Sequence, residues 1–161
     1  MCASFDPSID EILGDANSSL EEVEERARRR LGSNRFIVWE GDAQTFQFGY
    51  VGGDAEELLG HSSADWLTEE FWTNHVIHPE DRNDAVAYCA LATVKAKDHA
   101  FKYRARTTSG EVIWLEDFVR VLLSPRGIPE RLRGLMIELE ADEVSRSPRY
   151  RPGLATLEAL P

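Results

Sequence analysis

Cysteine is scarce in this sequence, which has only Cys2 and Cys89 among its 161 residues. Two cysteines cannot build the several cross-links of a disulfide-stabilised secreted scaffold. Two free thiols in a reducing cytosol are therefore expected, and a single disulfide between them is the alternative.

Long apolar runs are also missing. No stretch approaches the roughly 20 apolar residues that a membrane-spanning helix needs. Residues 1–20 lack the basic start and apolar run of a signal peptide. We therefore expect a cytoplasmic protein with no membrane partner.

Basic residues are outnumbered, with 18 Lys and Arg against 29 Asp and Glu and a net charge of -11. Such a surface repels phosphate backbones, so nucleic acid is not expected as a partner. The hydrophobic fraction of 42% is ordinary for a soluble protein and suffices for one core.

Motifs of catalysis and metal binding are missing as well. Gly49, Gly52 and Gly53 lack the spacing and the lysine of a nucleotide-binding loop, and no nucleophile elbow occurs. His75 and His78 are three residues apart, but without a supporting cysteine or carboxylate they make a weak zinc signal. The sequence predicts no metal site and no enzyme activity.

The N-terminal part contains one clear helix signal. Residues 1–18 are small, polar or acidic and are expected to be loose, whereas Ser19 and Glu22 form a capping box that starts a helix over 19–31. The helix carries one narrow apolar stripe, made of Leu20, Val23, Ala27 and Leu31. The stripe is expected to dock on its own domain, and a dimer contact is the alternative.

Strand patterns dominate the rest of the chain. Strands are expected over residues 34–40, 45–51, 101–106, 112–123 and 135–139. In the second of these, Phe46, Phe48 and Tyr50 alternate and are expected on one side of the sheet.

Two helices are expected between the strands. A short helix follows Asp54 and ends at Gly60. A longer helix begins at Pro79, which suits the first helical position. Its inward face is expected to hold Val86, Cys89, Ala90, Thr93 and Val94.

This order predicts an α+β fold. We expect a five-stranded antiparallel sheet with short helices and one longer helix on one face, preceded by the N-terminal amphipathic helix, which can cover the other face. The expected divisions are an extension over residues 1–33, a domain over 34–142 and a flexible tail or linker over 143–161.

Four local motifs resemble those of one family. They are Gly53–Gly60 (Gly-Asp-Ala-Glu-Glu-Leu-Leu-Gly), His78–Arg82 (His-Pro-Glu-Asp-Arg), Tyr103–Arg106 followed by Gly110 and Trp114, and Gly127–Pro129 followed by Leu132–Gly134. Their order and spacing resemble a PAS domain with a PAC-type C-terminal half, the sensory box of bacterial signalling proteins.

The resemblance implies a regulatory function. Such domains bind a small molecule or a protein partner and pass a signal to a histidine kinase, a cyclic-dinucleotide enzyme or a transcription regulator, none of which this chain contains. A homodimer through the N-terminal helix or the sheet face is also expected. One departure concerns the end of the last strand, where Glu138, Leu139 and Glu140 replace the family's aspartate, aliphatic residue and threonine, so the usual coupling to an outgoing helix is in doubt.

The cofactor is left unknown. Haem-binding relatives place an axial ligand on the long helix, which has no histidine here, and Cys89 there is expected to be a small core residue. Residues 61–77 lack the cysteine of a light-driven flavin adduct. Flavin bound without an adduct stays open, and a colourless protein is expected.

The expected ligand pocket lies between the sheet and the helices. Its candidate residues are Trp39, Phe48, Trp66, Trp72, Val86, Cys89, Ala90, Phe101, Tyr103 and Trp114. Most of these aromatic side chains are expected simply to fill the core. Trp114, in the middle of the longest strand, is expected to pack against helices and support the fold.

The rival interpretation is a small cone-shaped α+β enzyme of the isomerase or dehydratase type. It would need a buried Asp–His pair, formed by Asp81 or Asp117 with His78 or His99. His78 is expected instead to form a local bond at the entrance of the long helix.

Overall fold

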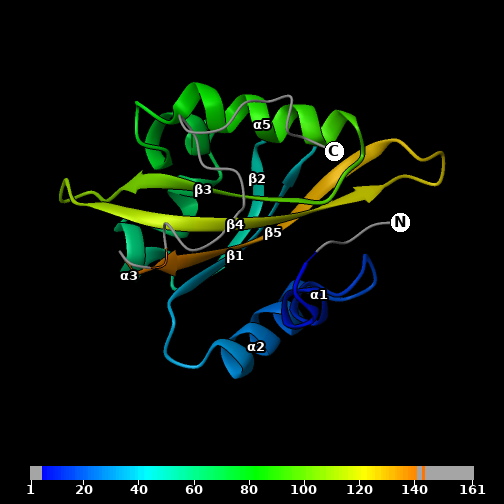
Figure 1. The fold of residues 1–161 in the computed structure, drawn as a ribbon, viewed down its shortest axis with the longest axis horizontal. Coiled ribbons are helices and arrows are strands. Elements are labelled where there is room, and N and C mark those ends of the chain that lie inside the picture. The colour runs from blue at the N-terminus through cyan, green and yellow to red at the C-terminus, as the bar shows by residue number, and fades with distance from the viewer. Residues whose placement is uncertain (1–4, 141–142, 144–161) are drawn as a thin grey trace.

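A five-stranded antiparallel sheet separates two layers of helices (Figure 1). The structure is a computed structural model that describes residues 5–140 and 143. The strands are β1 Phe36–Asp42, β2 Phe48–Gly53, β3 His99–Arg106, β4 Val112–Leu123 and β5 Pro129–Leu139, in the spatial order β2-β1-β5-β4-β3. The predicted fold class is confirmed.

Four helices cover the face that we call the inner face, and two cover the outer face. The inner helices are α3 Ala55–Leu59, α4 Ser63–Trp66, the π-helix η1 Trp72–Val76 and α5 Arg82–Val94. The outer helices are α1 Pro7–Leu13 and α2 Leu20–Leu31, which lie on the opposite side of the sheet from α5 (Figure 1).

Each face of the sheet has its own apolar core, because successive side chains of a strand point to opposite faces. In β4, Leu115 and Val119 belong to the inner core and Phe118 to the outer one. Asp117 lies between Leu115 and Val119 on the same inner face, where it lines a small cavity.

The outer layer is larger than the sequence predicted. Residues 7–13 form α1 rather than a loose segment, because Asp6 accepts a hydrogen bond from the Ser8 N–H and Pro7 suits the first turn. The helix then buries Ile9, Ile12 and Leu13 on the sheet.

Helix α2 agrees with its prediction. The reciprocal Ser19–Glu22 capping box is present, and Gly32 follows the last turn. Val23 and Ala27 are completely buried in the outer core, so the stripe docks on its own domain. The prediction that this helix covers the second face of the sheet is confirmed.

Polar contacts hold the outer helices to the sheet. On β4, Arg120 donates to the Gly14 carbonyl at 2.5 Å and pairs with Asp10. Tyr50 of β2 donates to the Glu24 carboxylate of α2 at 2.8 Å.

Strand β2 is displaced from the strand predicted over residues 45–51. β2 begins at Phe48, and Phe46 lies in the turn with a φ of 61°. The pairing shifts at Gly49, since Gly41 pairs with Phe48 and Glu40 with Tyr50. The bulge sends Tyr50 to the outer face, so the prediction that it shares one side with Phe46 and Phe48 is wrong.

Helix α5 begins at Arg82, three residues after the predicted start at Pro79. The preceding turn instead binds β3, because Asp81 accepts hydrogen bonds from the backbone N–H and the guanidinium of Arg104. The His78 Nδ1 atom accepts the Glu80 backbone N–H at 3.1 Å, which confirms its local role.

The buried face of α5 is rotated from the predicted one. It consists of Ala85, Tyr88, Cys89, Ala92 and Thr93. Val86 and Ala90 are half-buried. Val94 is 78% exposed because the helix ends there, beyond the edge of the core.

Candidate ligand-binding site

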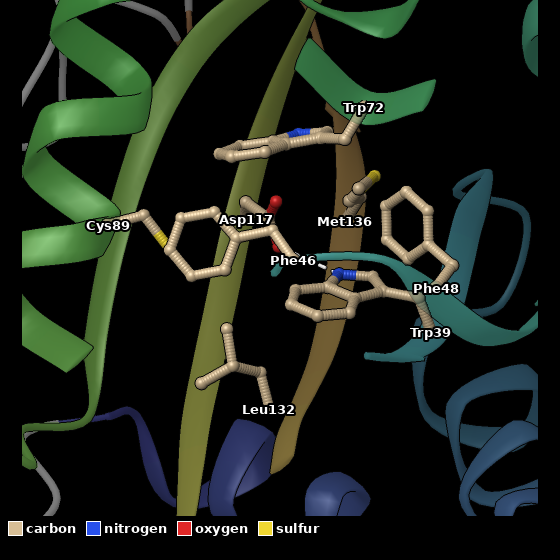
Figure 2. A pocket seen from close by; sticks show the side chains of 8 residues that line it. All are labelled: Trp39, Phe46, Phe48, Trp72, Cys89, Asp117, Leu132 and Met136. Atoms are coloured by element: carbon tan, nitrogen blue, oxygen red, sulfur yellow. Dashed lines mark hydrogen bonds between the residues drawn. The ribbon is translucent and has the colours of Figure 1, made fainter. Parts of the chain in front are cut away.

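The inner core contains a narrow cavity beside the centre of the sheet. Eight side chains line it: Trp39, Phe46, Phe48, Trp72, Cys89, Asp117, Leu132 and Met136 (Figure 2). Its volume of about 10 Å³ corresponds to about one water molecule. A larger ligand needs a side chain to move.

Asp117 is the one ionisable carboxylate of this lining, and only 1% of its surface is exposed. The Trp39 Nε1–H donates to its Oδ1 atom at 3.0 Å, and the Tyr103 hydroxyl donates to its Oδ2 atom at 2.8 Å. The carboxylate is therefore held by two neutral donors from two other strands.

A third ring extends this arrangement. The Trp72 Nε1–H donates to the Tyr103 hydroxyl oxygen at 3.1 Å, which leaves the phenolic hydrogen for Asp117. The chain of hydrogen bonds runs from η1 through β3 to β4 and points toward the carboxylate throughout. Such chains polarise one another and become stronger in a low-dielectric core.

Burial governs the acidity of this group. Because the charged form loses its hydration, the pKa of Asp117 rises to about 7, although the hydrogen bonds from Tyr103 and Trp39 oppose the rise. Burial and the neighbouring Asp117 also hold the pKa of Tyr103 well above its usual value. The phenol therefore stays a donor at neutral pH.

A glycine makes room for Trp39. Trp39 on β1 pairs with Gly134 on β5, and a Cβ atom at Gly134 would overlap with the Trp39 indole, Nε1 included. The absence of a side chain lets the ring lie against the strand and reach Asp117.

Cys89, which also lines the cavity, forms a buried pair with His99. The His99 Nε2 atom lies 3.3 Å from the Cys89 Sγ atom, and Nδ1 lies 2.8 Å from the Lys97 carbonyl oxygen. Burial lowers the pKa of His99 to about 4 and raises that of the Cys89 thiol. His99 is therefore neutral at pH 7, and the thiol stays protonated.

The predicted Asp–His alternatives do not form within the described residues. Asp117 is bonded to Trp39 and Tyr103, and Asp81 to Arg104. His78 and His99 have backbone and thiol partners instead.

The structure brings together part of the predicted ligand set. Trp39, Phe48, Trp72 and Cys89 line the cavity, and Tyr103 reaches it through Asp117. Five predicted residues do not line the cavity: Trp66, Phe101, Val86, Ala90 and Trp114. Trp66 and Phe101 belong to the inner core, and Val86 packs against that core.

Trp114 lies away from this site. It is half-buried on the outer face, where the Arg104 guanidinium carbon is 5.9 Å from its ring centroid. The prediction that Trp114 packs against helices is wrong, because alternation along β4 turns it away from the inner helices and it lies beyond the outer core.

Three lining residues were missed, namely Phe46, Leu132 and Met136. Asp117 was considered only as a catalytic partner. A charged residue at an inward position between Leu115 and Val119 was the available signal, since an unpaired charge in a core costs stability. No local signal marked Phe46, because its position follows from the turn.

Two further properties apply to the part of the chain that the structure describes. It holds no group of three or more metal-ligating side chains suited to an ion. No helix in it has the length and apolar character needed to cross a membrane.

Comparison with protein families gives a match over most of the sheet. A family model described as the PAS fold matches residues 49–136. The N-terminal domain of a diguanylate cyclase with a PAS/PAC sensor from Marinobacter aquaeolei is 32% identical, with a TM-score of 0.63. The alignment covers 68% of this chain and 99% of that domain.

More distant structures share the fold. A sensory box histidine kinase/response regulator from Burkholderia thailandensis is 21% identical over 68% of this chain and 80% of its own, with a TM-score of 0.53. PAS-B of Drosophila melanogaster Cycle, solved with ethylene glycol, is 14% identical over 64% of this chain and 99% of its own, with a TM-score of 0.55. No curated protein matches the sequence.

Proposed function

The chain belongs to the PAS fold family, and we propose that it is a sensory domain that binds a small molecule in the Asp117 cavity. The signal passes to an output module outside this chain, such as a histidine kinase, a cyclic-dinucleotide enzyme or a transcription regulator. The Marinobacter relative, whose PAS/PAC sensor belongs to a diguanylate cyclase, supports this class of output.

The buried Asp117 carboxylate carries the proposal. A charged group in an apolar core costs stability, and no ion pair compensates Asp117 among the residues described. Perturbed carboxylates in cavities concentrate at functional sites. The aromatic walls around it supply the apolar contact area that ligand pockets use.

The partners of Asp117 and His99 favour binding over catalysis. The rival enzyme would need an aspartate paired with a histidine in the buried site. Both histidines of the rival interpretation are engaged elsewhere. We therefore favour a signalling module over an isomerase or dehydratase.

Strand β5 offers a route for the signal. Met136 lines the cavity, and Glu138 follows two residues later, near the end of the strand. Glu138 accepts two hydrogen bonds from Arg35, at 2.8 and 3.0 Å, which ties this end of the sheet to the segment between α2 and β1. We propose that Glu138 fills the family's coupling position through this ion pair.

An NMR fragment screen tests the binding function. Soluble small molecules would be added to ¹⁵N-labelled protein, with the indole N–H signals of Trp39 and Trp72 as reporters. Hits should shift these two signals and leave that of Trp114 in place. Hits that shift only surface signals, or a screen without hits, would contradict a ligand-binding function. An absorption scan of the purified protein tests the expected lack of colour.

A further inference from the structure

The chemistry of the cavity also points to a class of ligand. We propose that the Asp117 cavity binds a small organic ammonium ion that carries at least one N–H, with the nitrogen at the carboxylate and the carbon chain among the aromatic rings. The inference rests on the proposed ligand-binding function and names the charge of its ligand.

The first argument is the acceptor capacity of Asp117. An ionised carboxylate offers about four lone-pair sites. Two are used, by the Trp39 indole and the Tyr103 hydroxyl. The group also forms part of the cavity wall. A ligand N–H can therefore bond to the carboxylate without displacing either protein donor.

The second argument is charge. Within residues 5–140 and at 143, no Lys, Arg or His side chain pairs with Asp117, and its hydrogen-bond donors are neutral. Arg133 of β5 is buried and follows the lining residue Leu132, but it binds Glu40 and the Asp15 carbonyl instead. A ligand cation supplies the missing counter-charge to the ionised form of Asp117, whereas this form would repel a carboxylate or phosphate ligand.

The third argument is the aromatic wall. Trp39, Phe46, Phe48 and Trp72 surround the cavity with the carboxylate at its centre (Figure 2). Trp39 and Phe48 meet edge to face with centroids 5.4 Å apart, as do Phe46 and Trp72 at 6.0 Å. Ring faces attract cations, and this attraction grows when both partners are desolvated.

Phe46 is the side chain that has to move. The other seven lining residues are buried, and Phe46 alone is half-buried. It lies in the β1–β2 turn with a φ of 61°, a region that bulky residues rarely adopt and that occurs at ligand clamps. Displacement of its ring would enlarge the cavity from the solvent side and admit an alkyl chain.

Three probes of similar length and different charge test the inference. Butylammonium, 1-butanol and pentanoate would be titrated into the 161-residue chain, with the indole N–H signals of Trp39 and Trp72 giving the affinities. Butylammonium should bind at least about tenfold more tightly than 1-butanol, as expected for a desolvated charge pair. Pentanoate should bind most weakly.

Two variants separate the contributions. Asp117→Asn should bind butylammonium and 1-butanol with equal affinity, because the charge is gone while the rings remain. Phe46→Ala keeps the carboxylate and opens the cavity, so it should bind butylammonium more tightly than the wild type and retain the preference over 1-butanol.

The outcomes are distinguishable. Tighter binding of pentanoate or equal binding of all three probes would overturn the ammonium inference and leave the ligand-binding function standing. Retention of the preference in a folded Asp117→Asn protein would also overturn it. If no probe binds either the wild type or Phe46→Ala, both the inference and the proposed use of this cavity are contradicted.

Discussion

Tyr103 on β3 donates its hydroxyl hydrogen to Asp117 on the neighbouring strand β4 at 2.8 Å, in a region where both side chains are shielded from water. The same oxygen accepts the Trp72 indole N–H. One phenol therefore satisfies a donor from the helical layer and an acceptor from the sheet.

Removal of this hydroxyl should destabilise the fold. In Tyr103→Phe, the Trp72 N–H loses its acceptor and Asp117 loses one donor. Each buried polar group left unsatisfied costs about 1–3 kcal/mol, so the free energy of unfolding in urea should fall by at least about 2 kcal/mol. Tyr50→Phe is the control, because Tyr50 is half-buried and donates its hydrogen bond to the Glu24 carboxylate. An equal loss in both variants would contradict this account.

Asp117 should give the protein a distinctive pH dependence. Its pKa is raised from 3.8 to about 7 by burial. Between these values the folded state keeps a proton that the unfolded state has released, so stability falls as pH rises and levels off above about pH 7. Relative to Asp117→Asn, the wild type should lose up to about 1.4 kcal/mol per pH unit in this window.

The comparison with the variant is necessary because His99 acts in the opposite direction. Its pKa is lowered from 6.5 to about 4, so it binds its proton more weakly in the folded state and stability rises with pH across that range. Urea unfolding of both proteins at several pH values isolates the Asp117 contribution. A difference between them that stays constant with pH would disprove it.

The strands show how far sequence reasoning reaches. Alternation and the four family motifs were enough to predict the sheet and the helices α3 and α5, but not α4 or η1. They could not predict the cavity, because Trp39 and Asp117 are 78 residues apart in the chain and meet only through the packed sheet. The position of Phe46 depends on the β1–β2 turn, where its φ is 61°, and alternation alone does not reveal this turn.

Helix α1 illustrates a different kind of miss. Asp6, Pro7 and the spacing of Ile9, Ile12 and Leu13 are ordinary helix signals. The helix has only 7 residues, a length that is unstable without tertiary contacts. Packing against the sheet supplies those contacts. The sequence did not indicate them, because the surrounding segment is mostly polar.

Gly134 should be sensitive to the smallest side chain. In Gly134→Ala the new methyl group would overlap with the Trp39 indole, and the ring would have to leave its hydrogen bond with Asp117. Overpacking of this kind costs about 1–3 kcal/mol. Gly49→Ala, where a Cβ atom meets nothing within 4 Å, is the control. Urea unfolding and the Trp39 indole signal measure the effect, and equal stability of the two variants would argue against the contact.

The α2 stripe should matter for folding of the single chain. Val23→Glu places a carboxylate at a completely buried position in the outer core, and it should lower the free energy of unfolding by more than about 2 kcal/mol. Glu25→Ala, on the exposed side of the same helix, should change it by less than about 0.5 kcal/mol. An unchanged melting temperature in Val23→Glu would show that α2 does not dock as described.

Two tryptophans should respond differently to truncation. Trp66 is completely buried in the inner core, so Trp66→Ala should cost about 3–5 kcal/mol of stability. Trp114→Ala should cost less than half as much, because its ring is half-buried on the outer face beside Arg104. Equal losses in urea unfolding would mean that Trp114 is a core residue after all.

Asp117 and Phe118 are consecutive residues of β4 that point to opposite faces, one into the cavity and one beneath the α1–α2 pair. A partner or second copy that binds the sheet face must first lift these helices and uncover Phe118. If this opening changes the affinity of the cavity for its ligand by some factor, then ligand binding must change the affinity for the partner by the same factor. A single peptide bond of β4 thus separates the residue that would contact the ligand from the residue that a partner on the sheet face would uncover.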